Sequence, residues 1–401
     1  MRTRSLVVAW VLLGSLGCAG PSLEQRRQSA LPAIQTLQTG EWVEAEQESA
    51  RVLQEDTDNP FALVVDAITR YKRTMHQLVA DLIGVAATVE VAGTLNQKYL
   101  SFTLDTAEAE LARIDDDLAR ASRCADFNMD LCLACWEYDW NHSGEVDDFD
   151  RRLFEVELDH DGQPYPEGDP RRRPTFRFDR GDLLWARAFL SFQRAALHLA
   201  QAYDASGALQ TLQSENEPSR IVFRLTDATR ITRARQLILD GLDLTEKARQ
   251  AYLAESDDER EWLPNPRQKD HPLPMPVDEV LYQTWGAILV DTTALVKGET
   301  VLRVADLIEL ADERAEPMPA GSIDLGGFLS KPRDIVLDIQ ALDRAEDNDD
   351  IEGALRLVLG DWYVTGRPPS TLTMQLRRMK SEVDRGDESI ERKLRYVLWL
   401  N

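Results

Sequence analysis

Apolar side chains recur at three- and four-residue intervals along most of the chain, which is the spacing of one face of an α-helix. Segment 180–204 is a clear case, because Asp182 can cap its start and apolar residues then follow at those intervals. Alternating patterns typical of strands are limited to short pieces near 174–178 and 220–224. We therefore predict an all-α protein, with helices over 23–38, 41–55, 60–90, 95–122, 126–138, 180–204, 228–255, 277–294, 299–313, 334–345, 349–360, 370–384 and 387–400.

Two regions interrupt this helical pattern. Residues 139–175 are acidic and rich in loop-forming residues, and residues 256–276 contain five prolines. Proline favours extended, polyproline-like backbone, so the second region is either a linker between two halves or a loop packed over the helices. A weaker break follows at 317–325.

The net charge of the chain limits the classes of partner that it is expected to bind. The 401 residues include 46 Lys and Arg against 70 Asp and Glu, which gives a formal net charge of −24. A nucleic-acid-binding protein must neutralise phosphates with basic side chains, so this balance argues against nucleic acid and favours cations. The 43% of hydrophobic residues is enough for one large or two smaller packed domains.

The N-terminus has the features of an export signal. Arg2 and Arg4 precede an uncharged, largely apolar run from Ser5 to Gly17, and Cys18 follows directly. A basic start, a short apolar stretch and small residues before a cysteine resemble a bacterial lipoprotein signal. The resemblance implies cleavage before Cys18 and a lipid at Cys18, with Ala19 implying the outer membrane rather than the inner one. The alternative is an ordinary signal peptide in which Cys18 is incidental.

Residues 139–150 read Asp-Trp-Asn-His-Ser-Gly-Glu-Val-Asp-Asp-Phe-Asp and resemble an EF-hand calcium loop. Such a twelve-residue loop alternates oxygen donors around a glycine turn, because Ca²⁺ takes six to eight hard oxygen ligands. Asp150 stands where glutamate is usual, and this shorter carboxylate tilts the site toward Mg²⁺. The alternative is an Asp/Asn-rich surface turn that holds no ion. The expected ligands are Asp139, Asn141, Ser143, Glu145 through its carbonyl, Asp147 and Asp150.

The flanks of this loop complete the expected motif. Leu131, Leu133, Trp136 and Tyr138 would lie on an entering helix, and the residues after Phe149 would begin an exiting one. A partial second pattern follows, which is either a solvated acidic loop or a source of further ligands. It comprises Glu157, Asp159, Asp161 and Gly162.

Three cysteines remain after Cys18, namely Cys124, Cys132 and Cys135. In an oxidising compartment two of them are expected to pair, which leaves one over. A structural disulfide, buried free thiols and a Zn²⁺ site completed by His142 are the open interpretations. The zinc interpretation competes with the calcium loop, which contains His142. A thioredoxin-like role would need a strand directly before Cys132, where the pattern predicts a helix.

A stretch beginning with Gly40-Glu41-Trp42-Val43-Glu44-Ala45 resembles one tetratricopeptide repeat over about 33–68. Leu53, Asp56, Asn59 and Ala62 continue the match. Because further clean copies are missing, we expect one repeat-like helical hairpin rather than a long stack. A generic pair of antiparallel helices is the alternative.

Residues 370–376 are similar to the Ser-Thr-Ile-Thr-Gln-Gln-Leu motif of peptidoglycan glycosyltransferases, and the similarity extends to residue 394. That family needs an upstream glutamate in a Glu-Asp pair. This sequence has Leu342-Asp343 instead, so the catalytic acid is missing. The alternative is a surface helix capped by Ser370.

These observations predict an all-α helical hairpin array with an inserted acidic, EF-hand-like loop. It would be exported, lipid-anchored to the outer membrane, on its periplasmic face or at the cell surface, and would bind Ca²⁺ as a binding or scaffold module. The alternatives are an envelope hydrolase or transferase, with Glu155 and Glu157 as first candidate acids, and a solute-capturing partner of a transporter. The expected regions are a signal peptide (1–17), a repeat-like helical region (18–125), the ion loop and acidic insertion (126–175), long helices (176–255), a Pro-rich linker or loop (256–276) and a C-terminal helical region (277–401).

Overall fold

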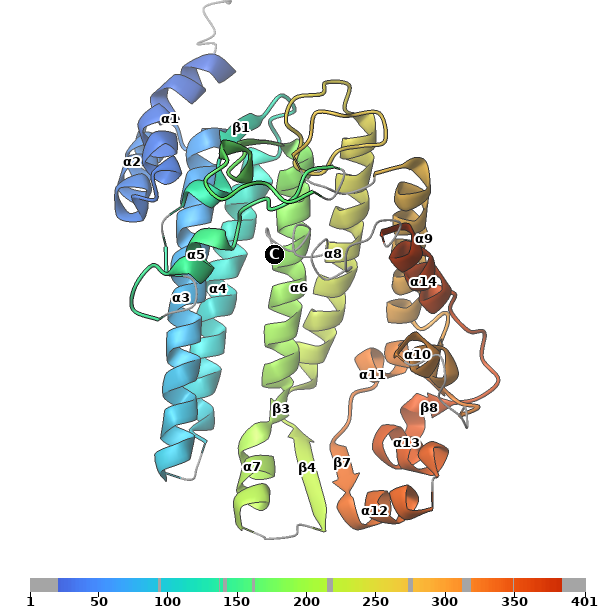
Figure 1. Ribbon diagram of the computed structural model, residues 1–401. Helices are drawn as coiled ribbons and strands as arrows, with labels where there is room; N and C mark the ends of the chain where they lie inside the picture. Colours follow the sequence, from blue (N-terminus) through green and yellow to red (C-terminus); the bar gives the residue numbers. More distant parts are fainter. Residues whose placement is uncertain are drawn as a thin grey trace, which may run out of the picture.

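A computed structural model describes the protein over most of its length. The described residues are 21–92, 95–136, 138–139, 143–160, 163–214, 219–272, 277–311, 319–348 and 350–383. Within these ranges the predicted all-α class is confirmed, with fourteen α-helices and strands of at most six residues (Figure 1). The signal segment with Cys18 and the predicted helix 387–400 lie outside the described residues.

The N-terminal helices form a hairpin that packs on a third, longer helix. The side chain of Ser22 accepts a hydrogen bond from the Gln25 N–H and so caps the first helix. Gly40 takes a left-handed φ of 78° in the first turn, and Asn59 caps the third helix by accepting from the Phe61 and Ala62 N–H groups. The three helices are α1 (Leu23–Gln38), α2 (Trp42–Glu55) and α3 (Pro60–Ala92).

Long helices stand side by side across the molecule (Figure 1). The order of packing is α3, α4 (Gln97–Ala121), α6 (Arg180–Ala202), α8 (Ala228–Ala254) and α9 (Glu279–Lys297). Gly241 of α8 permits its close approach to α6, because a Cβ there would lie 2.7 Å from the Phe192 ring.

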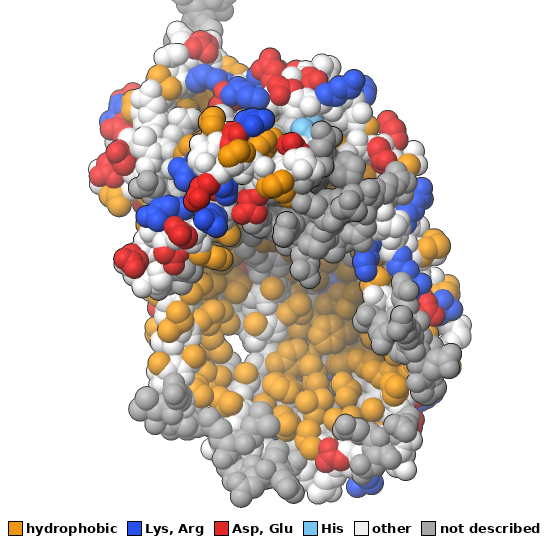
Figure 2. All heavy atoms as spheres, in the orientation of Figure 1, with side chains coloured by type: hydrophobic (Ala, Val, Ile, Leu, Met, Phe, Trp, Pro, Cys, Tyr) orange, Lys and Arg blue, Asp and Glu red, His pale blue; other side chains and the backbone are white. Residues whose placement is uncertain are grey.

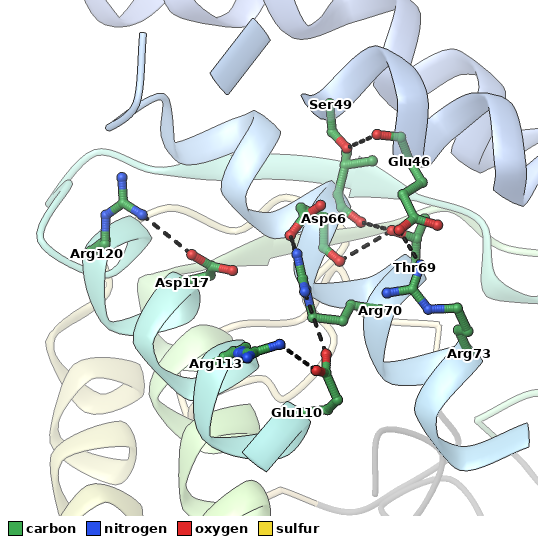
Figure 3. Close-up of polar contacts among 11 residues, drawn as sticks. Glu46, Ser49, Asp66, Thr69, Arg70, Arg73, Glu110, Arg113, Asp117 and Arg120 are labelled. Atoms are coloured by element: carbon green, nitrogen blue, oxygen red, sulfur yellow. Dashed lines mark hydrogen bonds and ion pairs between the residues drawn. The ribbon is translucent and has the colours of Figure 1, made fainter. Parts of the chain in front are cut away.

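Ion pairs join α2, α3 and α4 along one flank, as Figure 3 shows. Arg70 of α3 lies between Asp66, at 2.9 Å, and Glu110 of α4, at 3.4 Å. Arg73 pairs with Glu46 of α2. Burial, together with the charge of Asp66, raises the pKa of Asp117. These ion pairs therefore help to fix the positions of α2, α3 and α4 relative to one another.

Residues 126–138 do not form the predicted helix. Asn128–Leu131 is instead a strand, β1, which pairs antiparallel with β2 (Phe176–Asp179) so that Asn128 faces Asp179. Cys132 then leads into a short 3-10 helix, η1 (Leu133–Cys135). The strand forms because Phe127, Met129 and Leu131 alternate with polar residues and are all buried. Two further short helices follow in this region, α5 (Asp148–Arg152) and η2 (Pro170–Arg172).

The structure also contains two small three-stranded sheets. The first includes the strand that directly follows α6, and the second lies within the C-terminal part of the chain. Strand order is β3-β4-β7 in one and β5-β6-β8 in the other. The predicted helix 334–345 therefore starts as a strand, and so does part of 299–313. The elements are β3 (Tyr203–Asp204), α7 (Ala205–Ser214), β4 (Arg220–Leu225), β5 (Leu302–Arg303), α10 (Val304–Ala311), β6 (Ser322–Ile323), α11 (Leu325–Ser330), β7 (Ile335–Asp338), α12 (Ile339–Asp347), α13 (Ile351–Leu359), η3 (Gly360–Trp362), β8 (Tyr363–Val364) and α14 (Leu372–Val383).

The described part of the Pro-rich region, 256–272, is a packed loop rather than a linker. Trp262 and Asn265 are both fully buried. The Asn265 side-chain amide donates to the Tyr252 carbonyl at 2.8 Å and so ties the loop to the end of α8. Of the two interpretations of this region, the structure supports the packed loop. Separately, none of the helices in the described ranges combines the length and the apolar character that crossing a bilayer requires.

Candidate functional site

The 139–150 loop is closed at its start by Asp139. The Asp139 carboxylate accepts hydrogen bonds from the Ser143 N–H at 2.9 Å and from the Gly144 N–H at 2.7 Å. Gly144 adopts φ +99°, a left-handed conformation that side-chain-bearing residues rarely take. The chain therefore turns sharply around the Asp139 carboxylate, at the glycine where the sequence predicts the turn.

The end of the loop forms the first turn of α5. The Asp147 carboxylate accepts from the Phe149 N–H at 2.8 Å and from the Asp150 N–H at 3.2 Å. In return, the Asp150 carboxylate accepts from the Asp147 N–H at 2.9 Å, which completes a capping box. Asp150 is 2% exposed. Both acids are thus held in fixed orientations by backbone donors.

The structure describes only part of the predicted set of ion ligands. Asn141 and His142 lie outside the described residues, and Glu145 is exposed to solvent. In the parts of the chain that can be described, no three His, Cys, Asp or Glu side chains form a group able to hold a metal ion. The entering helix is replaced by β1 and η1, and the exiting helix α5 has five residues. The flanks therefore differ from the helix-loop-helix that the resemblance implies.

An aromatic and cationic contact fixes the loop to the N-terminal helices. The Lys72 Nζ of α3 lies 3.9 Å from the Trp42 ring centroid and 3.7 Å from that of Tyr138. Trp42 also packs edge-on against Trp136, with ring centroids 5.1 Å apart. Burial lowers the pKa of Lys72 to about 7. Because Tyr138 directly precedes Asp139, the first loop residue is attached to a rigid contact with α2 and α3.

Cys132 and Cys135 form a disulfide, and Cys124 is a half-buried free thiol. This pairing overturns the Zn²⁺ interpretation, because two of its four proposed ligands are joined to each other. A strand does precede Cys132, contrary to the sequence prediction. However, β1 belongs to a two-stranded antiparallel sheet and leads into a three-residue 3-10 helix, rather than into the long helix of a thioredoxin-like unit.

The two acids proposed first for an enzyme, Glu155 and Glu157, lie in the acidic insertion. Glu155 is 8% exposed and pairs with Arg172 at 2.8 Å and with Arg173 at 3.0 Å. These two ion pairs join Glu155 to Arg172 and Arg173 within the acidic insertion. Glu157 is half-buried, and its backbone carbonyl accepts from the Tyr165 N–H at 2.8 Å.

A second acidic group, which the sequence did not indicate, lies where α6 begins and α8 ends. Asp182, at 6% exposure, accepts from the Tyr252 hydroxyl at 2.9 Å and from the Asp179 N–H at 2.7 Å. Burial and contact with Asp179 raise the pKa of Glu255 to about 11. Burial and the charge of Asp179 raise the pKa of Glu261 to about 8. Carboxyl groups with shifted pKa values are candidates for acid–base work, but here Asp182 belongs to the capping box of α6 and Glu255 is the C-cap residue of α8.

The stretch that is similar to glycosyltransferases begins with a capped helix. The Ser370 side chain accepts from the Leu372 N–H at 3.2 Å, and α14 starts at Leu372. Leu372, Leu376 and Met379 are all half-buried. Residues 384–394, where the similarity ends, lie outside the described residues. The described half of the stretch therefore fits the capped surface helix.

Comparison with other proteins gives no match, either among family models or among curated proteins and solved structures.

Proposed function

We propose that this chain is a calcium-binding helical protein, anchored in the cell envelope by a lipid at Cys18, that acts as a binding or scaffold module. The observation that carries the calcium part is the turn around Asp139, whose carboxylate accepts N–H groups from both Ser143 and Gly144. In the sequence, oxygen-bearing residues flank this turn at the spacing of a Ca²⁺ loop.

The ion would be held by the side chains of Asp139, Asn141, Ser143, Asp147 and Asp150, and by the Glu145 carbonyl. Asp147 and Asp150 each accept backbone N–H groups. An ionised carboxylate has about four acceptor positions, so a backbone hydrogen bond does not prevent it from ligating an ion. Mg²⁺ is the competing ion, because Asp150 is shorter than the usual glutamate. Binding would neutralise clustered acids and so stabilise the loop.

The contact of Tyr138 with Lys72 and Trp42 connects this loop to helices α2 and α3. Ordering the loop at Asp139 would also restrict Tyr138 and the two side chains that it packs against. We therefore assign the ion a structural role that links the acidic insertion to α2 and α3, and not a catalytic role.

The test is a calorimetric Ca²⁺ titration of the 19–401 fragment with thermal melts beside it. We expect about one ion per chain, with a dissociation constant of roughly 10⁻⁴–10⁻³ M, as in weak extracellular modules. Asp139→Ala should abolish binding. Asp148→Ala is the matched control, because Asp148 is in the loop but is not an expected ligand. Unchanged heat and melting temperature at millimolar Ca²⁺ would refute the calcium proposal, and tighter binding of Mg²⁺ would reassign the ion.

The anchor has a separate test. Cys18 lies five positions before Leu23, where α1 begins, so a lipid there would hold the α1–α2 hairpin close to the membrane. Expressed in a bacterial host, the full chain should partition into the detergent phase after phase separation, and Cys18→Ser should move it to the aqueous phase. Aqueous partitioning of both proteins would show that Cys18 is incidental.

The two alternative functions, an envelope hydrolase and a solute-capturing protein, each require a specific structural feature. An envelope hydrolase would need a carboxyl pair open to a substrate, whereas the acids with raised pKa values are engaged at the start of α6 and the end of α8. A solute-capturing protein would need an enclosed cavity. Binding of Ca²⁺ that leaves peptidoglycan and small solutes unaffected would favour the scaffold role over both.

A further inference from the structure

The two cysteines of the disulfide at η1 differ in their access to solvent. Cys135 is exposed, whereas Cys132 is buried, with 8% of its surface exposed. Thiol–disulfide exchange begins when a thiolate from outside attacks one of the two sulfurs, so access decides which sulfur is attacked. An outside thiol can therefore reach the Cys135 Sγ, and the buried Cys132 Sγ is then the sulfur that departs.

The backbone on both sides of this disulfide is held in place by contacts other than the S–S bond. Strand β1 pairs with β2 directly before Cys132, and the two residues between the cysteines are buried. Directly after Cys135, Trp136 packs against Trp42 with ring centroids 5.1 Å apart. Because strand pairing and burial fix this segment, we expect the fold to persist when the S–S bond opens.

The disulfide closes a very small loop, because its cysteines are three positions apart in the sequence. The stabilisation that a disulfide gives by restricting the unfolded chain grows with the length of the loop that it closes. A loop of this size therefore adds less stability than a disulfide between distant parts of the chain would add. Stabilisation of the fold is accordingly a weak reason for a disulfide at this position.

A backbone acceptor is in place for the reduced form of Cys132. The Arg173 carbonyl oxygen lies 3.6 Å from the Cys132 Sγ. A disulfide sulfur has no hydrogen to donate, whereas the thiol of reduced Cys132 has one. The segment that carries this carbonyl is fixed separately, because the Arg172 carbonyl accepts from the Val156 N–H at 2.8 Å and the Arg173 side chain pairs with Glu155. Reduction would thus add a hydrogen bond that the disulfide form cannot make, which favours the reduced state.

We propose that Cys132 and Cys135 form a reversible thiol–disulfide exchange site that is reduced by a pair of partner thiols. The first partner thiolate attacks the Cys135 Sγ, and a mixed disulfide forms there as the bond to Cys132 breaks. Cys132 departs as a thiolate, takes a proton from water and donates it to the Arg173 carbonyl. The second partner thiolate then attacks the partner sulfur of the mixed disulfide, and Cys135 departs as a thiolate that is protonated in turn. The two partner thiols are oxidised to a disulfide, and their two electrons reduce the site.

This exchange needs an accessible sulfur and a stabilised departing thiol, and neither depends on a thioredoxin-like fold. The reverse reaction would pass the disulfide on to partner thiols, so the same site can oxidise as well as be reduced. The proposal is independent of calcium and of the lipid at Cys18.

The first experiment measures whether glutathione reduces the folded protein. The full chain carrying Cys18→Ser and Cys124→Ser retains only this pair of cysteines. It is equilibrated in glutathione buffers of increasing reducing strength, and free thiols are counted by mass after acid quenching and alkylation. We expect reduction under conditions in which glutathione keeps cytosolic thiols reduced, with the helical circular dichroism unchanged. A disulfide that opens only when urea unfolds the chain would overturn the proposal.

Two thiol sources are distinguished in the same assay. Faster reduction by thioredoxin than by an equal concentration of glutathione would support the proposal with a dithiol protein as the partner. Faster reduction by glutathione would support it with a small thiol as the partner. Resistance of the folded chain to both reductants would overturn it.

The second experiment tests which sulfur is attacked. In the same background, Cys132→Ser leaves Cys135 as the single cysteine, and Cys135→Ser leaves Cys132. We expect Cys135 to form a mixed disulfide with oxidised glutathione roughly tenfold faster than Cys132, or more, because the exposed thiol is the accessible one. A chain whose single cysteine is Cys124, a half-buried thiol outside the pair, is the control and should also react more slowly than Cys135. Equal rates for Cys132 and Cys135 in variants that melt cooperatively would overturn the proposal, and the first experiment tests it without either substitution.

Discussion

The Tyr252 hydroxyl donates a hydrogen bond of 2.9 Å to the Asp182 carboxylate inside the contact between α8 and α6. Tyr252 is 1% exposed and Asp182 is 6% exposed, so water does not compete for this bond. Asp182 also accepts from the Asp179 N–H in the capping box of α6. One carboxylate therefore holds the first turn of α6 and ties it to the last turns of α8.

Removal of this hydroxyl should destabilise the protein. Tyr252→Phe keeps the ring and its packing but leaves the buried Asp182 carboxylate with one donor fewer. We expect the free energy of unfolding to fall by about 1–3 kcal/mol, the usual cost of an unsatisfied buried polar group. Urea denaturation measures the change. Tyr99→Phe is the control, because Tyr99 is exposed and its hydrogen bond to Asp81 is long at 3.3 Å. An equally large loss of unfolding free energy in that variant would contradict the assignment.

The acidic group at the same contact should make stability depend on pH. The pKa of Glu255 is raised from 4.5 to about 11 and that of Glu261 from 4.5 to about 8. The folded state therefore keeps protons that the unfolded state releases above pH 4.5. Stability is highest at mildly acidic pH and falls as pH rises toward those folded values, by up to about 1.4 kcal/mol per pH unit for each proton.

Glu255→Gln tests this assignment, because the amide is neutral and can still donate toward Asp179. Denaturation between pH 5 and pH 9 should show a shallower decline for the variant than for the wild-type chain. The variant should also be the more stable protein at pH 9. Glu299→Gln, at an exposed position, should leave the pH profile as it was. Parallel profiles for wild type and Glu255→Gln would rule out Glu255 as the titrating group.

The contact between α4 and α6 should show the opposite pH dependence. Hydrogen bonds from His198 and Arg194 lower the pKa of Glu108 from 4.5 to about 2. Its stabilising contribution is therefore complete above about pH 4.5 and is lost as pH falls toward 2.

Glu108→Gln should remove that contribution. We expect a loss of about 1–2 kcal/mol at pH 7, because the side chain keeps some contact with solvent, and a difference from wild type that shrinks below pH 4. Chemical denaturation at pH 7 and pH 3 gives both values. Glu44→Gln, on the exposed face of α2, serves as the comparison. A deficit of equal size at both pH values would mean that packing, and not charge, explains the loss.

Periodicity located the long helices well because local signals mark their ends. The predicted helix 23–38 matches α1 to the residue, since Ser22 caps its start and Gly40 ends the turn beyond it. The predicted helix 228–255 matches α8 to within one residue, with Asp227 as its cap. Where the apolar stripe and the capping residue agree, sequence alone sets the helix bounds.

The prediction of a helix over 126–138 was wrong for a reason that the sequence contains. Phe127, Met129 and Leu131 alternate with polar residues, which is a strand pattern, and all three are buried in β1. The interpretation of the chain by helical periodicity assigned these residues to a helix instead. The pairing of β1 with β2, 45 or more residues further along, then decides the conformation.

The acidic group around Asp182 could not be found from sequence. Asp182 is 73 residues from Glu255 and 79 from Glu261 in the chain, and each fits a local role on its own. Only the packing of α6 on α8, with the loop 256–272 folded back over both, brings the carboxyl groups together. By contrast, the turn at Gly144 was predictable because its positive φ is a local property.

The close contact of α6 with α8 yields the last prediction, a pair of identical substitutions with opposite effects. At Gly241 of α8, an added Cβ would lie 2.7 Å from Cε1 and 2.9 Å from Cζ of Phe192. Gly241→Ala should therefore force the helices apart and cost about 1–3 kcal/mol. Gly84 lies within α3 with no heavy atom within 4 Å of the added Cβ. There the same change should stabilise by about 0.5–1 kcal/mol, since alanine loses less backbone entropy in a helix. Thermal or urea denaturation of the two variants measures both signs, and a gain in stability from Gly241→Ala would show that Phe192 can move away from α8 at little cost.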